Sequence, residues 1–282
     1  MPDAVPAPGT PSLDAKSPYE LRVDQGKDVP EPDVRAALVS GDMGFLHSFT
    51  TGATVDGPGV RVVAWTSGCM WRCQYCHNPD TWTMTNGMPV SVERAASELS
   101  KYRHGLRTMS GGFTLSGGEP LMQHRFAVRL LAAAKGMGIH TALDTNGYFG
   151  DKLSDAELQT IDLVMLDLKA YDPERHRRVT GMDNAPTLAF ARRLADRRRP
   201  MWVRYVLVPG LTDDLDDIRQ TAAFAASLGV VERVDVLPFH QMGKYKWERL
   251  GMTYALADTQ PPDQALVDEV CGIFRSAGLK AV

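Results

Sequence analysis

The sequence predicts an α/β fold: a partial (β/α)6 barrel of the TIM type, with parallel strands. From residue 58 onward, six short segments rich in β-branched and apolar residues alternate with segments of helical periodicity. Such alternation is typical of repeated βαβ units with right-handed crossovers. The strand segments are almost continuously apolar, as expected when helices cover a parallel sheet. Hydrophobic residues make up 44% of the 282 residues, which suffices for a large core and argues against a mainly disordered chain.

The expected elements follow one another in a regular order. The six expected strands are residues 60–65, 113–115, 139–143, 163–168, 202–208 and 234–237. Helices are expected at residues 91–102, 123–135, 188–195 and 263–277, and a further one where apolar residues recur every three or four positions, at Leu215, Ile218, Ala222, Ala225 and Leu228. In a barrel of this type the functional residues lie at the carboxyl ends of the strands.

The first 45 residues differ from the rest of the chain. Seven of the 18 prolines lie at or before Pro32, and apolar periodicity is weak. We expect a mobile extension over residues 1–45, with a short helix near residues 34–38, and a barrel domain over residues 46–282. For the extension, a disordered tail without a function is the favoured interpretation.

The charge balance excludes several classes of partner. Lysine and arginine number 31 and aspartate and glutamate 34, giving a net charge of −3. We therefore expect no nucleic-acid partner and no anionic membrane surface. No apolar run approaches the ~20 residues of a membrane helix, and the first twenty residues do not resemble a secretory signal. The expected location is the cytoplasm.

Three cysteines follow the first expected strand with the spacing C-x3-C-x2-C: Cys69, Cys73 and Cys76. Thiols this close can converge on one metal centre. Three ligands to a [4Fe–4S] cluster leave one iron open to a small molecule, although four thiolates are usual. A zinc site completed by His77 or Cys271 is an alternative, and a disulfide is a weaker one. Cys271 lies in the last expected helix, where a buried structural thiol is expected.

This spacing resembles that of the radical S-adenosylmethionine (SAM) enzymes. The resemblance implies that the open iron binds SAM and that one electron from the cluster cleaves it, giving methionine and a 5′-deoxyadenosyl radical. Tyr75 matches an aromatic position of that family beside the adenine; the alternative is a ring that only packs the loop.

Further polar residues follow the other expected strands. The Ser116–Pro120 segment, sequence SGGEP, contains glycines that permit close backbone approach, and in the radical enzymes it reaches the methionyl ammonium; alone it could be an ordinary turn. Asp144, Asp167, Lys169 and His240 also stand at strand ends, which predicts that they line the site. The alternatives are helix capping by Asp144, a salt bridge between Asp167 and Lys169, and a loop cap by His240.

Residues 46–282 resemble the activating enzymes of pyruvate formate-lyase nearly from end to end. The matching stretches are residues 54–59, 76–82, 143–147, 162–169, 204–210, 237–240 and 243–247. Relatives that act on other glycyl-radical enzymes often carry an inserted eight-cysteine segment after the first motif. Residues 77–112 contain no cysteine, which favours the pyruvate formate-lyase type.

The resemblance implies an oxidoreductase of anaerobic metabolism that installs a glycyl radical on pyruvate formate-lyase. Electrons would come from flavodoxin or ferredoxin. The alternatives are activation of another glycyl-radical enzyme and a non-catalytic, metal-stabilised binding module. Carried over by position, the cluster ligands are Cys69, Cys73 and Cys76, the SAM contacts are Tyr75, Cys76, His77, Gly118, Asp167, Leu168, Lys169 and His240, and the residues that hold the partner's glycine loop are Asp56 and Arg204.

Asp144 and Asp167 also suggest a cation site. Both end strands of the expected sheet, and a bound methionyl carboxylate would add a third negative charge. At an effective dielectric constant near 20, two like charges about 4 Å apart repel by roughly 4 kcal/mol. A hard cation, monovalent or other, suits oxygen ligands, with the backbone oxygens of Thr145 and Met165 as further ligands. The alternative is that Lys169 alone balances the acids.

Overall fold

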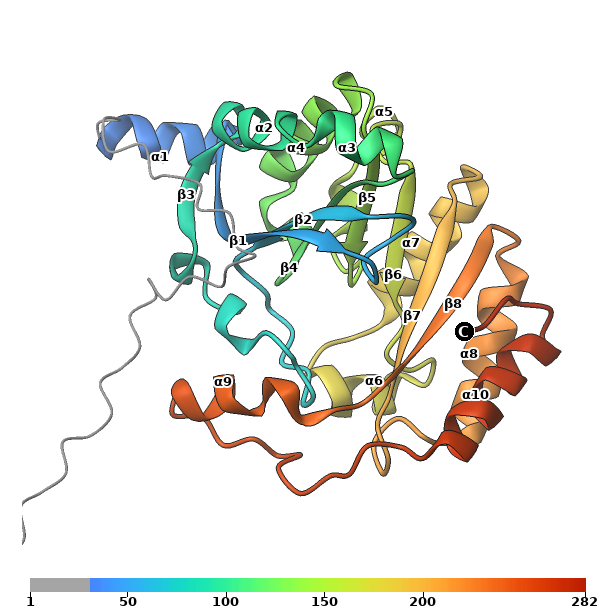
Figure 1. Ribbon diagram of the computed structural model, residues 1–282. Coiled ribbons are helices and arrows are strands. Elements are labelled where there is room, and N and C mark those ends of the chain that lie inside the picture. The colour runs from blue at the N-terminus through green and yellow to red at the C-terminus, as the bar shows by residue number, and fades with distance from the viewer. Residues whose placement is uncertain (1–30) are drawn as a thin grey trace, which may run out of the picture.

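The computed structural model describes residues 31–282 and contains one open sheet of eight strands in the order β3-β1-β2-β4-β5-β6-β7-β8 (Figure 1). β2 and β4 to β8 are mutually parallel, and β1 and β3 add antiparallel pairings at one edge. The strands are β1 (Met43–Ala53), β2 (Arg61–Thr66), β3 (Met88–Ser91), β4 (Gly112–Gly117), β5 (His140–Thr145), β6 (Leu163–Asp167), β7 (Met201–Leu207) and β8 (Val231–Pro238). The predicted partial barrel of parallel strands is confirmed.

The six parallel strands are those expected from the sequence, and β1 and β3 are additions that it did not predict. β1 has several polar residues and an irregular burial pattern, and β3 is four residues long and contains Pro89. Both strands depend on partners distant in the sequence rather than on a local signal. The expected boundary between residues 45 and 46 falls inside β1, whose Phe45 pairs with Pro89.

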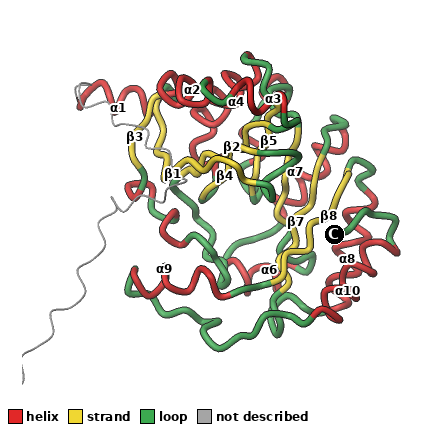
Figure 2. Tube along the Cα trace, viewed as in Figure 1, coloured by secondary structure: helices red, strands yellow, loops and turns green. Residues whose placement is uncertain are grey.

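Most of the helices cover the outer side of the sheet, and the short helices that follow β6 and β8 lie beyond the carboxyl ends of the strands (Figure 2). They are α1 (Glu31–Ser40), α2 (Val92–Ser100), α3 (Arg103–Thr108), α4 (His124–Gly136), α5 (Asp155–Leu158), α6 (Pro173–Thr180), α7 (Ala185–Asp196), α8 (Leu215–Ser227), α9 (Lys244–Arg249) and α10 (Gln264–Ser276). α1 confirms the short helix expected near residues 34–38. Of the mobile extension expected over residues 1–45, residues 1–30 lie outside the described residues, and the rest forms α1 and the start of β1. The helix expected at 91–102 corresponds to α2, and α3 begins just beyond the expected range.

Short polar helices were not predicted because their signals are caps rather than apolar periodicity. α6 has the sequence PERHRRVT. The Asp172 side chain accepts a hydrogen bond from the Arg175 backbone N–H, proline occupies the first turn, and Gly181 ends the helix at φ 77°. An N-terminal carboxylate, an early proline and a left-handed glycine together define both ends of a helix.

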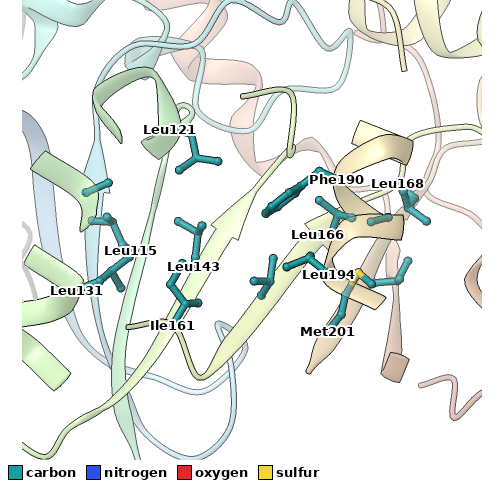
Figure 3. Packing of buried hydrophobic residues seen from close by; sticks show 14 of the residues in the cluster. Leu115, Leu121, Leu131, Leu143, Ile161, Leu166, Leu168, Phe190, Leu194 and Met201 are labelled. Atoms are coloured by element: carbon teal, nitrogen blue, oxygen red, sulfur yellow. The ribbon is translucent and has the colours of Figure 1, made fainter. Parts of the chain in front are cut away.

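The main core lies between the sheet and the outer helices (Figure 3). Leu115, Leu143 and Leu166, from three neighbouring strands, have 0% exposure and belong to one cluster with Leu131 of α4 and Leu194 of α7. Burial of each such side chain contributes roughly 1.5–3 kcal/mol. This packing fixes which face of each strand meets the helices.

The opposite face of the same strands carries the charged residues. Successive side chains of a strand point to opposite faces. Ala142 and Met165 therefore lie on the inner face, in a separate small cluster, and Asp144 and Asp167 stand two positions further along the same face. The β6–β7 register places Asp167 directly beside Arg204. Because the apolar side chains of these strands pack against the outer helices, Asp144, Asp167 and Arg204 lie on the inner, concave side of the sheet.

Within residues 31–282, no helix combines the length and the apolar character required to cross a bilayer.

Candidate radical SAM site

The cysteine loop follows β2 at the carboxyl end of the parallel strands, where the sequence places the chemistry. Its backbone is held from two sides. Gly68 N–H donates to the Thr81 carbonyl at 2.7 Å, and Arg72 N–H donates to the Thr180 carbonyl of α6 at 2.8 Å. The loop is therefore fixed between the segment that follows it and a helix about 100 residues further along.

The three loop cysteines are free, partly buried thiols that influence one another electrostatically. Burial raises the pKa of all three, that of Cys73 to about 12, and Lys169 opposes the rise at Cys73. A buried thiolate needs a positive partner, and bound iron ions would supply that charge. Three soft thiol donors in one loop fit an iron–sulfur cluster.

The structure weakens the zinc alternative. Cys271 lies in α10 at 4% exposure, within the main core outside the sheet. The His77 ring packs edge-on against His240, with 4.7 Å between ring centroids. Across the described part of the chain, no group of three or more His, Cys, Asp or Glu is arranged as a metal site. The cluster assignment consequently depends on the position of the three thiols in one loop and on the charges around them.

The SGGEP segment packs directly against the start of the cysteine loop. Glu119 N–H donates to the Gly68 carbonyl at 2.8 Å. A Cβ atom at Gly118 would lie 2.4 Å from that same carbonyl oxygen, so no larger residue fits without a backbone shift. The close approach of the SGGEP backbone to the cysteine loop, and not an ordinary turn, therefore explains the glycine at position 118.

Glu119 joins the ends of β4 and β5. Its carboxylate is fully buried and accepts hydrogen bonds from the Thr145 hydroxyl at 2.7 Å, the Asn146 N–H at 2.8 Å and the Leu121 N–H at 2.9 Å. Burial raises its pKa to about 7, and these donors oppose the rise. The sequence analysis named only Gly118 of this segment as a site residue. Glu119 follows it directly in the SGGEP motif, and an acid at that position was the signal that could have identified it.

Asp144, Asp167, Lys169 and Arg204 form one charged group at the ends of β5, β6 and β7. Arg204 donates to Asp144 at 2.9 Å, and Lys169 Nζ lies 3.0 Å from Asp167 Oδ1. Burial raises the pKa of Asp167, Asp144 adds to the rise, and Lys169 opposes it. Burial alone would lower the pKa of Lys169, but Asp167, Tyr75 and Cys73 together outweigh burial and raise that pKa. Each acid therefore has its own basic partner.

Of the two local roles considered for Asp167 and Asp144, the structure shows the first and not the second. The salt bridge between Asp167 and Lys169 is present. Helix capping by Asp144 is not: its carboxylate accepts instead from the Ser116 hydroxyl, at 2.6 Å, and from Arg204. Ser116 is a polar contact that the sequence analysis did not single out.

Asp56 reaches the same group from the loop between β1 and β2. Its carbonyl accepts a hydrogen bond from the Thr114 hydroxyl at 2.6 Å, and its carboxylate lies 3.9 Å from Arg204. Burial and Asp144 raise its pKa, while Arg204 opposes the rise. The two residues expected at the partner peptide are thus adjacent. Arg204 also contacts Asp144, which joins them to the acids expected at the cofactor.

Tyr75 offers a polar atom for a ligand. Its ring is 8% exposed, and its hydroxyl has no hydrogen-bond partner among the described residues. Lys169 Nζ lies 5.3 Å from the ring centroid, and the neighbouring Leu168 is buried at 3% exposure. A buried hydroxyl without a partner is costly unless a ligand pairs with it, so this end of the site fits a polar cofactor.

Two tryptophans lie around Cys76, in the matching stretches 76–82 and 243–247, and the sequence analysis assigned neither of them a role. The Trp82 indole packs in the same cluster as Cys76 and opposes the rise in the pKa of its thiol, and Trp247 Nε1 donates to the Cys76 carbonyl at 2.9 Å. The second contact joins residues 171 positions apart, which sequence reasoning could not anticipate.

Comparison with known proteins agrees with this geometry. Residues 63–225 match the sequence model of the radical SAM superfamily. The pyruvate formate-lyase 1-activating enzyme of Escherichia coli (strain K12) is 42% identical over 242 residues, which cover 85% of this chain and 98% of that protein. The pyruvate formate-lyase-activating enzyme of Staphylococcus aureus (strain USA300) is 43% identical over 232 residues, covering 79% and 92%.

Solved structures show the same architecture. A domain of a pyruvate-formate lyase-activating enzyme from Bacteroides vulgatus ATCC 8482 aligns with a TM-score of 0.50 at 27% identity, covering 61% of this chain and 98% of that one. A radical SAM methyltransferase from Sphaerobacter thermophilus shares the fold, with a TM-score of 0.56 at 19% identity over 90% of this chain and 81% of that one. The chain therefore belongs to the radical SAM superfamily and, within it, to the family of pyruvate formate-lyase-activating enzymes.

Proposed function

We propose that this chain is an oxidoreductase that installs a glycyl radical on pyruvate formate-lyase under anaerobic conditions, by reductive cleavage of SAM. The observation that carries the proposal is the 42% identity that spans 98% of the E. coli activating enzyme. The three-cysteine loop at the carboxyl edge of the sheet supports it, because chemistry in this type of fold is placed there.

Cys69, Cys73 and Cys76 would hold three irons of a [4Fe–4S] cluster. A bound cluster would supply the electron that cleaves SAM, and the chemistry would end in removal of a hydrogen atom from a glycine of the partner. The protein's part is to bind and orient the reactants. The residues proposed to contact SAM are Tyr75, Cys76, His77, Gly118, Asp167, Leu168, Lys169 and His240.

The surroundings of these residues suggest what each can do. Glycine at 118 lets the SGGEP backbone approach the cysteine loop closely enough to reach a ligand on it. Lys169, held by Asp167, offers further donor hydrogens to a cofactor carboxylate or hydroxyl. Tyr75 presents a flat apolar face and an unpaired hydroxyl, which suits a purine ring with polar edges.

Asp56 and Arg204 would hold the glycine loop of the partner. The Arg204 guanidinium has five N–H donors, and it pairs with Asp144 and lies close to Asp56. Carbonyl oxygens of an extended peptide could accept from its remaining donors, and Asp56 could accept from a peptide N–H. A fixed fork beside a carboxylate suits backbone recognition.

A cation between Asp144 and Asp167 remains part of the proposal, as a site filled together with SAM. Lys169 pairs with Asp167, and Arg204 pairs with Asp144. The negative charge of a bound methionyl carboxylate would therefore need a further positive partner. A hard monovalent or other cation bound by both acids and by the backbone oxygens of Thr145 and Met165 would be that partner. The β5–β6 register places Asp144 beside Met165, as this ligand set requires.

The remaining partners follow from the proposed chemistry. An external one-electron carrier is needed, and flavodoxin or ferredoxin is proposed. Residues 77–112 contain no further cysteine that could hold a second cluster. We propose a cytoplasmic location, where such carriers and pyruvate formate-lyase occur together.

Anaerobic reconstitution with iron and sulfide tests this function. The reduced protein should convert SAM to 5′-deoxyadenosine, and addition of pyruvate formate-lyase should give a glycyl radical visible by electron paramagnetic resonance. A radical on a different glycyl-radical enzyme, with none on pyruvate formate-lyase, would favour the alternative partner. Bound zinc without sulfide, and no cleavage of SAM, would favour the metal-stabilised binding module.

A further inference from the structure

Two tryptophans lie around Cys76. The Trp82 indole packs in the same cluster as Cys76 and opposes the rise in the pKa of its thiol, and Trp247 of α9 donates to the Cys76 carbonyl at 2.9 Å. The two indoles meet edge to face, with 5.1 Å between ring centroids and an interplanar angle of 86°. Trp82 is partly exposed to solvent and packs in the same cluster as Cys76, so an aromatic ring lies between the surface and the cysteine loop.

α9 is held firmly against this loop (Figure 1). Lys246 Nζ lies 3.0 Å from Asp80 and donates to the Asn78 side chain at 2.8 Å. At the start of the helix, a Cβ atom on Gly243 would lie 2.6 Å from the His77 ring. The backbone of α9 is thus packed on the segment that contains Cys76. A partner that docks on α9 would sit next to that cysteine.

The outer side of this segment exposes apolar side chains. Met242 is 65% exposed, Tyr245 57% and Leu250 40%. Among the residues whose exposure is described, these are three of the seven large hydrophobic residues that are exposed. Their concentration within nine consecutive positions is not expected of a surface that only meets water, and it marks an interaction site.

Basic groups surround the apolar residues. The Arg72 guanidinium lies 4.7 Å from the Trp82 ring centroid, and the sequence of α9 contains three basic residues, Lys244, Lys246 and Arg249, and one acid, Glu248. Lys246 is balanced by Asp80. The whole chain carries a net charge of −3, so this positive area stands out from an acidic protein. An acidic partner would be attracted to it.

We infer that α9, together with Met242, Leu250, Trp82 and Arg72, is the docking surface for a small electron-carrier protein that is acidic around its redox group. The inference rests on the proposed function, which requires one electron for the cluster. The carrier loses that electron, the cluster gains it, no covalent bond forms or breaks, and no proton has to move. The tryptophan pair keeps the carrier's redox group close to the cysteine that the electron reaches.

The test compares a protein donor with a small one. In the reconstituted enzyme, reduction of the cluster is followed by its visible absorbance after mixing with reduced flavodoxin or with dithionite. The variants are Tyr245→Ala and the double variant Lys244→Glu/Arg249→Glu. The matched control is Lys280→Glu, an exposed lysine beside the start of β8, away from the carboxyl edge. Arg72 is left unchanged because it hydrogen-bonds the Cys69 and Trp71 carbonyls.

The double variant should slow reduction by flavodoxin at least tenfold at low ionic strength and lose most of its salt dependence, since exposed charges act within about 10 Å at 0.1 M salt. Tyr245→Ala should weaken flavodoxin binding several-fold in calorimetry. Both should be reduced by dithionite at the wild-type rate, as should Lys280→Glu with either donor. Unchanged reduction by flavodoxin would overturn the inference, as would an equal loss with dithionite.

Two further outcomes separate the possible failures. If the double variant loses affinity for pyruvate formate-lyase and keeps its rate with flavodoxin, the surface belongs to that partner and the inference is wrong. If the wild-type cluster is reduced by both donors but no SAM is cleaved, the proposed function fails. The reduction rates then still decide where the carrier docks.

Discussion

Arg204 on β7 donates a hydrogen bond to Asp144 on β5 across the inner face of the sheet, at 2.9 Å, and its guanidinium also lies 3.9 Å from Asp56. Asp144 raises the pKa of Arg204 above its usual value, and burial opposes this effect. The arginine therefore stays charged and links the acids expected at the cofactor to the acid expected at the partner peptide. This link determines how variants of the site should behave.

Asp56→Asn should reduce glycyl-radical formation on the partner by at least tenfold while leaving uncoupled cleavage of SAM within about twofold. The substitution keeps the shape and removes only the charge beside the peptide. Both activities are measured on the same reconstituted sample, by electron paramagnetic resonance and by 5′-deoxyadenosine. Equal losses would place Asp56 in the cofactor site.

Arg204→Ala should impair both activities. It leaves Asp144 without its basic partner, and removing one member of a buried ion pair costs about 3–5 kcal/mol. SAM binding, measured by calorimetry, should weaken. Arg204→Lys should restore part of it, because lysine carries the positive charge but lacks the planar bidentate donors of the guanidinium. A normal SAM affinity in Arg204→Ala would show that Asp144 does not act at the cofactor.

Cys69→Ala, Cys73→Ala and Cys76→Ala should each abolish SAM cleavage, since a three-ligand cluster has no spare thiol. Iron and sulfide content per chain should fall in the same variants. Cys271→Ser is the matched control, because its thiol is buried in α10 within the outer core. That variant should keep its cluster and its activity, although its core packing is altered. A Cys271→Ser protein that folds but lacks iron would contradict the assignment.

SAM affinity should depend on the small cation in the buffer if Asp144 and Asp167 share a cation with the cofactor carboxylate. Binding is measured in buffers that differ only in the cation, with a large organic cation as the reference. Asp144→Asn should lose the dependence. The same affinity in every buffer, for both proteins, would leave Arg204 and Lys169 as the groups that balance the acids.

Glu119 should make stability depend on pH. Burial raises its pKa to about 7 from an ordinary value of 4.5, so the folded state binds this proton more tightly than the unfolded state. The corresponding stabilisation is complete below pH 4.5 and is lost as pH rises to 7, by roughly 3 kcal/mol in total. The free energy of unfolding of the wild type, relative to Glu119→Gln, should therefore fall between pH 5 and pH 8.

The Glu119 prediction is checked by chemical unfolding of both proteins in anaerobic buffers across that range. Gln cannot titrate, so a constant difference between the two curves would mean that the carboxylate is already charged at pH 5. Thr145→Val, which removes one donor to the carboxylate, should shift the fall toward higher pH, because that donor favours the charged form.

The sequence by itself determined the six parallel strands, the cysteine loop and the family. These features have local signals: continuous apolar runs, cysteines within eight positions, and glycine–acid segments directly after strands. Each signal lies within one element or one loop. The physical cause is likewise local, since an apolar strand must be covered and closely spaced thiols can share one centre.

The tertiary structure alone decided which distant residues meet. β1 and β3 carry weak strand patterns and exist through pairing with partners elsewhere in the chain. Arg204 meets Asp144 across 60 positions, and Trp247 reaches Cys76 across 171. A side chain's partner across a sheet is set by strand order and register, and one residue of slip would turn each charge to the opposite face. No periodicity within a single segment encodes that choice, so the ionic link and the α9 surface emerge only once the chain is folded.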